Sequence, residues 1–155
     1  MNGRLEKEIR AKRAMEKKLL ALPAVFTEFY YHLDAEGKSY TTANNYINHN
    51  IDFMNYILSN CQDVTFYSGV RPTHVNQYMA SIRHKEVNGE IKRIGDEIRA
   101  ARWTSLKAFF EFLKSDYIDD NPLDKTKRPK IKTEHKVTYL AKDEITPLDE
   151  AVSLV

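Results

Sequence analysis

The residues of this sequence that could do chemistry include bases held in a proline-containing segment near its C-terminal end. Six Lys and Arg residues recur at short intervals between positions 121 and 138, against only Asp124 and Glu134. Pro122 and Pro129 favour an extended backbone, because proline fixes its own φ and restrains the preceding residue. Such bases can follow a phosphate backbone, although a charged run is also typical of a solvated segment. The candidate nucleic-acid contacts here are Lys125, Lys127, Arg128, Lys130 and Lys132.

A second group of candidates lies on the polar face of an expected helix over residues 41–59. The apolar residues of this helix repeat at intervals of three and four: Ala43, Ile47, Ile51, Met54 and Leu58. Its opposite face is rich in amides, which can bond adenine edges and phosphates when a helix enters the major groove. The alternative is an ordinary solvent-facing side of a helix. The candidate residues are Thr41, Thr42, Asn44, Asn45, Asn48 and His49.

Patterns typical of catalysis or metal binding are missing from the sequence. It has no Gly-rich phosphate loop, no closely spaced pair of Cys and no His-Glu-x-x-His motif. Its five His are scattered, which favours ordinary core or surface roles over metal ligation. Cys61 is the single Cys, so an internal disulfide is excluded and a reducing compartment is indicated. We therefore expect no enzymatic activity, no metal and no small-molecule cofactor.

The net charge of +2 conceals a segregated distribution along the 155 residues. Residues 1–20 hold seven Lys or Arg and three Glu, a net charge of +4. Residues 121–138 also carry +4, whereas residues 21–120 carry −3. Two basic regions therefore flank a mildly acidic body, a pattern that attracts polyanions. The sequence has no long apolar run, so we expect a cytoplasmic protein, nucleoid-associated when bound to DNA, with no membrane partner.

Helical periodicity predicts the elements that position these candidates. It indicates helices over about 4–21, 24–35, 41–59, 72–85 and 96–115, with a surface loop at 86–95 and no strand. The last helix has a broad apolar face formed by Ile98, Trp103, Leu106, Phe109, Phe110 and Leu113. Its exposed bases form a loose row of further candidates: Arg99, Arg102 and Lys107. The prediction is an all-α, compact bundle of four to five helices followed by an extended basic linker.

Four motifs, in order over residues 23–150, resemble the N-terminal core-binding domain of the tyrosine recombinases, the phage-integrase family. The first two are Ser39-Tyr40-Thr41-Thr42-Ala43-Asn44-Asn45-Tyr46 and Thr73-His74-Val75-Asn76-Gln77-Tyr78-Met79. The third is the stretch from Arg102 to Leu113, which resembles the last helix of that domain. The fourth is Asn121-Pro122, then a Pro/Lys stretch and Tyr139-Leu140-Ala141-Lys142-Asp143-Glu144-Ile145, which resembles the hinge and the opening of the catalytic domain.

The resemblance implies a fold, a domain order and a function. It implies a SAM-like helical domain over residues 23–120, after a leading basic helix at 1–22. An interdomain linker would span 121–138, and residues 139–155 would be the first helix of a truncated catalytic domain. The helical and catalytic domains of this family clamp a recombination half-site from opposite faces of double-stranded DNA. The chain would then bind DNA and other recombinase subunits, as in mobile-element integration, without cleaving DNA, because the catalytic residues lie in the other domain.

The sequence departs from the family pattern in two places and leaves one rival function open. The last helix begins with Asp96-Glu97 rather than with the Ser or Thr frequent in the family, which puts close phosphate contact at that end in doubt. The leading helix is either an addition or a remnant of an arm-type DNA-binding domain. The rival function is a helical protein–protein interaction module with basic flanks.

Overall fold

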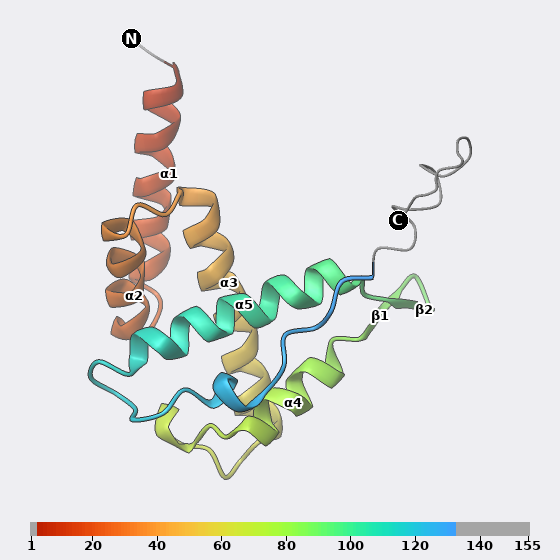
Figure 1. Ribbon diagram of the computed structural model, residues 1–155. Helices are drawn as coiled ribbons and strands as arrows, with labels where there is room; N and C mark the ends of the chain where they lie inside the picture. Colours follow the sequence, from red (N-terminus) through yellow and green to blue (C-terminus); the bar gives the residue numbers. More distant parts are fainter. Residues whose placement is uncertain (1–2, 133–155) are drawn as a thin grey trace, which may run out of the picture.

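The computed structural model describes residues 3–132, and helices dominate it (Figure 1). The expected five helices are present, which confirms the mainly helical fold class. They are α1 (Gly3–Leu19), α2 (Ala24–Ala35), α3 (Tyr40–Asn60), α4 (Pro72–Ser81) and α5 (Asp96–Leu113). Two short 3-10 helices, η1 (Tyr67–Gly69) and η2 (Pro122–Lys125), precede α4 and follow α5, respectively. The expected helix over 139–155 lies outside the described residues.

The expected loop at residues 86–95 is wrong, because most of it belongs to a β-hairpin. Strands β1 (His84–Val87) and β2 (Glu90–Arg93) pair antiparallel, with Val87 opposite Glu90. The turn between them has positive φ at Asn88 (53°) and Gly89 (82°). An Asn-Gly pair adopts this conformation readily, and it suits a two-residue hairpin. The hairpin also shortens the preceding helix, which ends at Ser81 rather than near Lys85.

Local signals in the sequence explain where the helices begin and end. Ser39 caps α3, since its side-chain oxygen accepts a hydrogen bond from the Thr42 backbone N–H at 3.1 Å. Gly37 adopts φ of 82° just after α2, the left-handed conformation common beyond a helix C-terminus. Pro72 occupies the first position of α4, where its missing N–H costs no helical hydrogen bond.

Helix α5 crosses the middle of the molecule (Figure 1), and three of its aromatic residues belong to the buried core. Phe109 and Phe110 are fully buried. The Phe109 ring lies 5.1 Å from the ring of Phe29 on α2, and the Phe110 ring lies 5.9 Å from that of Phe53 on α3. Edge-to-face contacts of this kind add to the free energy gained from burying apolar area.

The buried face of α3 differs from the expected one. The structure buries Phe53 and Ile57, whereas Leu58 is 71% exposed. Asn50 is also fully buried, where its amide donates to the carbonyls of Tyr46 (2.8 Å) and Ser105 (3.0 Å). Because Ser105 belongs to α5, a polar contact lies at the crossing of the two helices. On α5 itself, Ile98 was expected in the apolar face but is 52% exposed.

Helix α1 is attached to the bundle mainly through its C-terminal half. Met15 and Leu19 are buried, whereas every residue from Gly3 to Arg10 is exposed. Lys18 donates a hydrogen bond to Asn44 of α3 at 3.3 Å and another to Asn48. The first turns of α1 therefore project from the body of the molecule (Figure 1).

Candidate nucleic-acid interface

The described part of the expected linker, residues 121–132, is anchored along α5; we call it the basic segment. The indole N–H of Trp103 donates to the Thr126 hydroxyl at 2.8 Å. The Arg128 guanidinium Nε donates to the Thr104 hydroxyl at 3.1 Å. Both contacts come from successive residues of α5, so they fix the path of the backbone between positions 126 and 128. The remaining bases of the segment are exposed: Lys125, Lys127, Lys130 and Lys132.

The basic segment and α3 occupy opposite flanks of α5. Ser105 and Arg102 of α5 contact α3, whereas Trp103 and Thr104 contact the basic segment. The surface of α5 between the flanks includes Ala101 and Ala108, whose side chains are short. The basic segment and α3 therefore lie on either side of this part of α5.

The candidate residues on α3 divide into outward and inward groups. Thr41, Asn45 and Asn48 are exposed, at the spacing of one helical face. Asn44 is half-buried beside Lys18 of α1, which also contacts Asn48. The outward residues are half of the six candidates on this helix.

Two other candidates on α3 make contacts within the protein. The Thr42 backbone N–H is bound by the Ser39 cap, and its hydroxyl lies 3.1 Å from the Ser39 hydroxyl. His49 faces α5, with its Nδ1 at 2.7 Å from the Ser105 hydroxyl. Burial lowers the pKa of His49, and the neighbouring positive charge of Arg102 lowers it further. The imidazole is therefore neutral near pH 7 and forms part of the contact between α3 and α5.

Arg102, the central candidate on α5, is held in a polar cluster with two other elements. Its guanidinium donates to the Asp52 carboxylate of α3 at 2.8 Å and to the Tyr78 hydroxyl of α4 at 3.0 Å. The Tyr78 hydroxyl in turn donates to Asp52 at 2.6 Å. Burial, followed by the hydrogen bond to Asp52, raises the pKa of Tyr78 well above its usual range. Arg102 of α5 therefore forms hydrogen bonds to both α3 and α4.

The other two candidates on α5 also pair with acids. Lys107 lies 3.4 Å from the Asp124 carboxylate and 5.5 Å from the centre of the Trp103 ring. Arg99 lies 4.0 Å from Asp96, near the start of the helix. Asp96 is also 3.3 Å from Arg93 of the hairpin. Arg93 and Arg99 therefore partly neutralise Asp96, one of the two acidic residues at the start of α5.

The sequence analysis missed a third group of bases, at the foot of the hairpin beside the start of α5. Lys85 and Lys92 are paired directly opposite each other in the ladder, an arrangement that destabilises a hairpin. The charges of Arg83 and Arg93 contribute, after burial, to a lowered pKa of Arg99. Asp96, which lies against both Arg93 and Arg99, offsets part of this repulsion. The signal available in the sequence was the Asn-Gly pair, which predicts a hairpin and so brings the bases on either side together.

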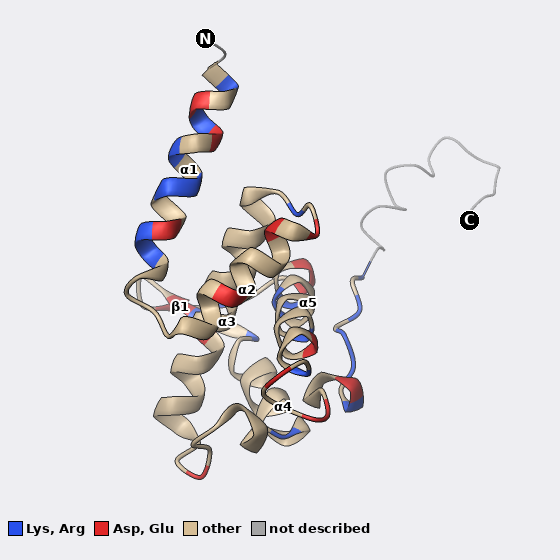
Figure 2. Cartoon of the chain, turned by 90° about the vertical axis from the view of Figure 1, so that its left-hand side faces the viewer, with Lys and Arg blue, Asp and Glu red and all other residues tan. Residues whose placement is uncertain are grey.

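The bases of the molecule collect at its edges rather than over the helical body. Figure 2 shows Lys and Arg concentrated on α1 and on the basic segment, whereas most of α3 carries neither.

Within residues 3–132, no cluster of His, Cys, Asp and Glu is suited to hold a metal ion. No helix in this part of the chain is long and apolar enough to cross a membrane. Comparison with protein-family models, curated proteins and solved structures finds no match to this chain.

Proposed function

We propose that the chain is the DNA-binding, core-binding domain of a site-specific tyrosine recombinase, with a SAM-like helical fold. It holds one face of a recombination half-site and positions it, while residues outside this chain perform strand cleavage. Its partners are double-stranded DNA and other recombinase subunits. The observation that carries the proposal is the anchored basic segment, which Trp103 and Arg128 hold against the flank of α5 opposite α3 and whose lysines are exposed.

Two kinds of contact would share the work of binding. The lysines of the basic segment and the bases at the foot of the hairpin would neutralise phosphates, which supplies most of the affinity. The outward face of α3, with Thr41, Asn45 and Asn48, would contribute base contacts in the major groove. Arg102 and His49 would act indirectly, because they hold the crossing of α3 and α5.

The proposal is tested by the salt dependence of DNA binding. Fluorescence anisotropy of the 155-residue chain with duplex DNA is measured from 50 to 200 mM salt. About four phosphate contacts predict that the affinity falls on the order of 100-fold over this range, because each contact releases condensed counterions. An affinity that hardly changes with salt, or the absence of binding at 50 mM, would contradict the proposal. The rival function, a protein-interaction module, would then be favoured.

A further inference from the structure

The hairpin of β1 and β2 projects beyond the start of α5 as a narrow two-stranded ribbon (Figure 1). Every residue of its strands except Val87 is exposed, so both faces of the ribbon are open to solvent. Positive φ at both Asn88 and Gly89 is typical of a type I′ turn, which fixes the shape of the ribbon. The Ile94 backbone N–H donates to the Arg83 carbonyl at 2.8 Å and continues the pairing to the body of the molecule. The hairpin is therefore an ordered projection.

Charged side chains are graded along the hairpin from the turn to the body. The acidic residues Glu86 and Glu90 lie within two residues of the turn. The bases lie nearer the body: Arg83, Lys85, Lys92 and Arg93. A surface that only attracts phosphates would not carry acids at its outer end, because like charges repel. The gradient indicates phosphates beside the foot of the hairpin and a different chemistry at its turn.

The bases also lie on both faces of the ribbon. Side chains alternate between the faces along each strand, so Lys85 and Lys92 share one face and Arg93 lies on the other. Arg93 is 3.3 Å from Asp96, yet its side chain is 62% exposed. A phosphate backbone borders each side of a DNA groove. A ribbon with bases on both faces therefore matches a groove better than it matches a flat surface.

The dimensions of the ribbon and the side chains near its turn suit the major groove. Paired strands are about 4.8 Å apart before their side chains are added. A major groove about 12 Å wide admits such a ribbon, whereas a minor groove about 6 Å wide does not. The carboxylates of Glu86 and Glu90 can accept from the amino group of cytosine, which is offered in the major groove. Ile91, which is 77% exposed, can contact the methyl group of thymine there.

The basic segment leads toward the same end of α5 as the hairpin. Asp124 lies 3.4 Å from Lys107, and two residues later the Thr126 hydroxyl accepts from Trp103 at 2.8 Å. The segment therefore runs antiparallel to α5, toward the end of the helix from which the hairpin projects (Figure 1). A duplex bound along the basic segment in this direction meets the hairpin.

We propose that the hairpin enters the major groove of the bound duplex with its turn toward the base edges. The side chains next to the turn contact cytosine and thymine, and the bases nearer the body contact the phosphates on either side of the groove. The hairpin is then a specificity-determining element in addition to the outward face of α3. This inference rests on the proposed function, because it requires that the chain binds DNA.

The salt dependence of binding to a duplex of random sequence tests the phosphate contacts. Lys85→Ala/Lys92→Ala should weaken binding about 10-fold and lower the slope of log affinity against log salt by about 2, because two phosphate contacts are lost. The urea midpoint should not fall, since the change removes a repulsive pair. The matched control Lys7→Ala/Lys17→Ala removes the same charge from exposed positions of α1 and should leave the slope nearly unchanged.

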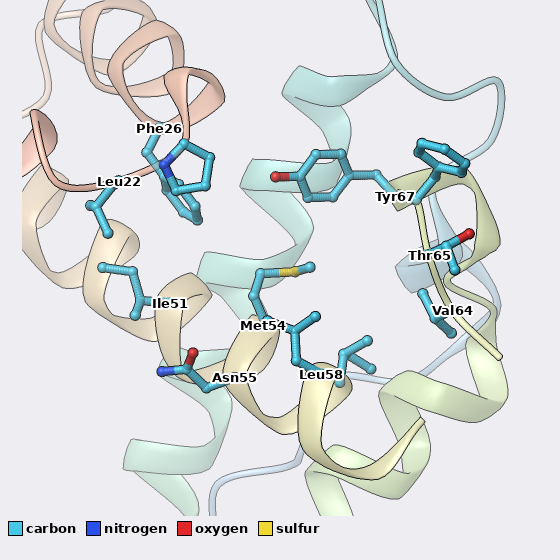
Figure 3. Close-up of a pocket in the computed structure, with 12 residues that line it drawn as sticks. Leu22, Phe26, Ile51, Met54, Asn55, Leu58, Val64, Thr65 and Tyr67 are labelled. Atoms are coloured by element: carbon cyan, nitrogen blue, oxygen red, sulfur yellow. The ribbon is translucent and has the colours of Figure 1, made fainter. Parts of the chain in front are cut away.

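Selection of bound sequences from a pool of random duplexes tests the base contacts. Glu86→Gln/Glu90→Gln should lose a preference for cytosine that the parent chain shows, and Ile91→Ala should lose a preference for thymine. Leu58→Ala is the matched control for Ile91→Ala. Leu58 is similarly exposed (71%) but lines an apolar groove between α2, α3 and η1 (Figure 3), so its replacement should leave the selected sequences unchanged.

The outcomes separate this inference from the proposed function. If the parent chain does not bind duplex DNA, both are wrong. If the parent binds with a steep salt dependence, but the hairpin variants bind with the same slope and select the same sequences, the inference alone is wrong. A parent chain that binds all sequences equally would also overturn the inference, because a hairpin turn against the base edges imposes sequence preferences.

Discussion

The two basic regions of the chain carry the same net charge of +4 in the sequence, at residues 1–20 and 121–138, yet the structure treats them differently. The basic segment is fixed against α5 by hydrogen bonds from Trp103 and Arg128. The first turns of α1 project from the bundle and carry their bases on an exposed helix. Equal charge therefore does not imply an equal role.

The difference teaches that anchoring, and not charge alone, distinguishes a binding site from a solvated run of bases. Bases on a fixed backbone lose less conformational freedom when they bind, so more of their attraction to an anion appears as affinity.

The largest expected effect comes from reversing charges in one region and then in the other. Lys127→Glu/Arg128→Glu/Lys130→Glu should weaken DNA binding by about 100-fold at low salt, because it removes three contacts and adds three repulsive charges. The matched control Arg10→Glu/Lys12→Glu/Arg13→Glu makes the same charge change on α1 and should weaken binding less than about 5-fold. Anisotropy titrations of both variants measure the difference.

The outcome of this comparison is decisive for the anchored segment. If the two triple variants lose affinity equally, net charge alone governs binding and the assignment to the basic segment is wrong. The urea unfolding midpoints of both should stay close to that of the parent chain, because all six replaced residues are exposed.

A smaller effect should follow from loosening the anchor without changing any charge. Thr126→Val removes the hydroxyl that accepts from Trp103 and that itself donates to the Leu123 carbonyl. Hydrogen bonds of this kind contribute about 1 kcal/mol each, so we expect DNA affinity to fall by about 5-fold. Thr126→Ser keeps the hydroxyl and should bind as the parent does. Equal affinities for Thr126→Val and the parent would show that anchoring contributes nothing.

The smallest effect concerns the α3–α5 crossing that supports the anchored side. Because the folded state lowers the pKa of His49, the unfolded chain binds a proton more readily below about pH 6.5. Stability therefore falls as the pH decreases from 6.5 toward the pKa of the folded state. We expect His49→Asn to reduce the loss of urea midpoint between pH 7.5 and 5.5. His84→Asn, on the exposed hairpin, is the control, and the same reduction in both variants would contradict the role of His49.

The helices of this fold could be predicted because their signals are local. Ser39 and Gly37 mark helix boundaries, and the aromatic residues of α5 repeat at helical spacing. The buried face of α3 could not be predicted, since its periodicity permits either Leu58 or Asn50 inside. The buried amide of Asn50 donates to Tyr46 within the same helix, and its second donor is satisfied by the Ser105 carbonyl, 55 residues away, which the sequence does not reveal. The hairpin was missed because its strands are short and almost wholly exposed, so they lack an alternating apolar pattern.

The sequence allowed us to predict the residue types of the candidate site, but not which of these residues make contacts within the protein. The sequence showed which residues are basic or amide-bearing, and the exposed lysines of the basic segment needed no further information. It could not show that Arg102 pairs with Asp52, because that contact depends on how α3 and α5 cross. The role of Trp103 was also hidden, since an aromatic residue at helical spacing is expected to pack in the core, whereas its N–H reaches Thr126.

The buried amide of Asn50 sets the register between α3 and α5. Sliding one helix by a single turn, about 5.4 Å, would break its hydrogen bond to the Ser105 carbonyl and leave one N–H of the amide without that partner, at a cost of about 1–3 kcal/mol. Successive base pairs of DNA are separated by about 3.4 Å, so a slip of one turn would displace the reading face by more than one base pair. If the protein binds DNA as proposed, the Asn50 amide does not touch the duplex. It nevertheless maintains the spacing between the outward face of α3 and the basic segment on α5, the two surfaces that would contact the DNA.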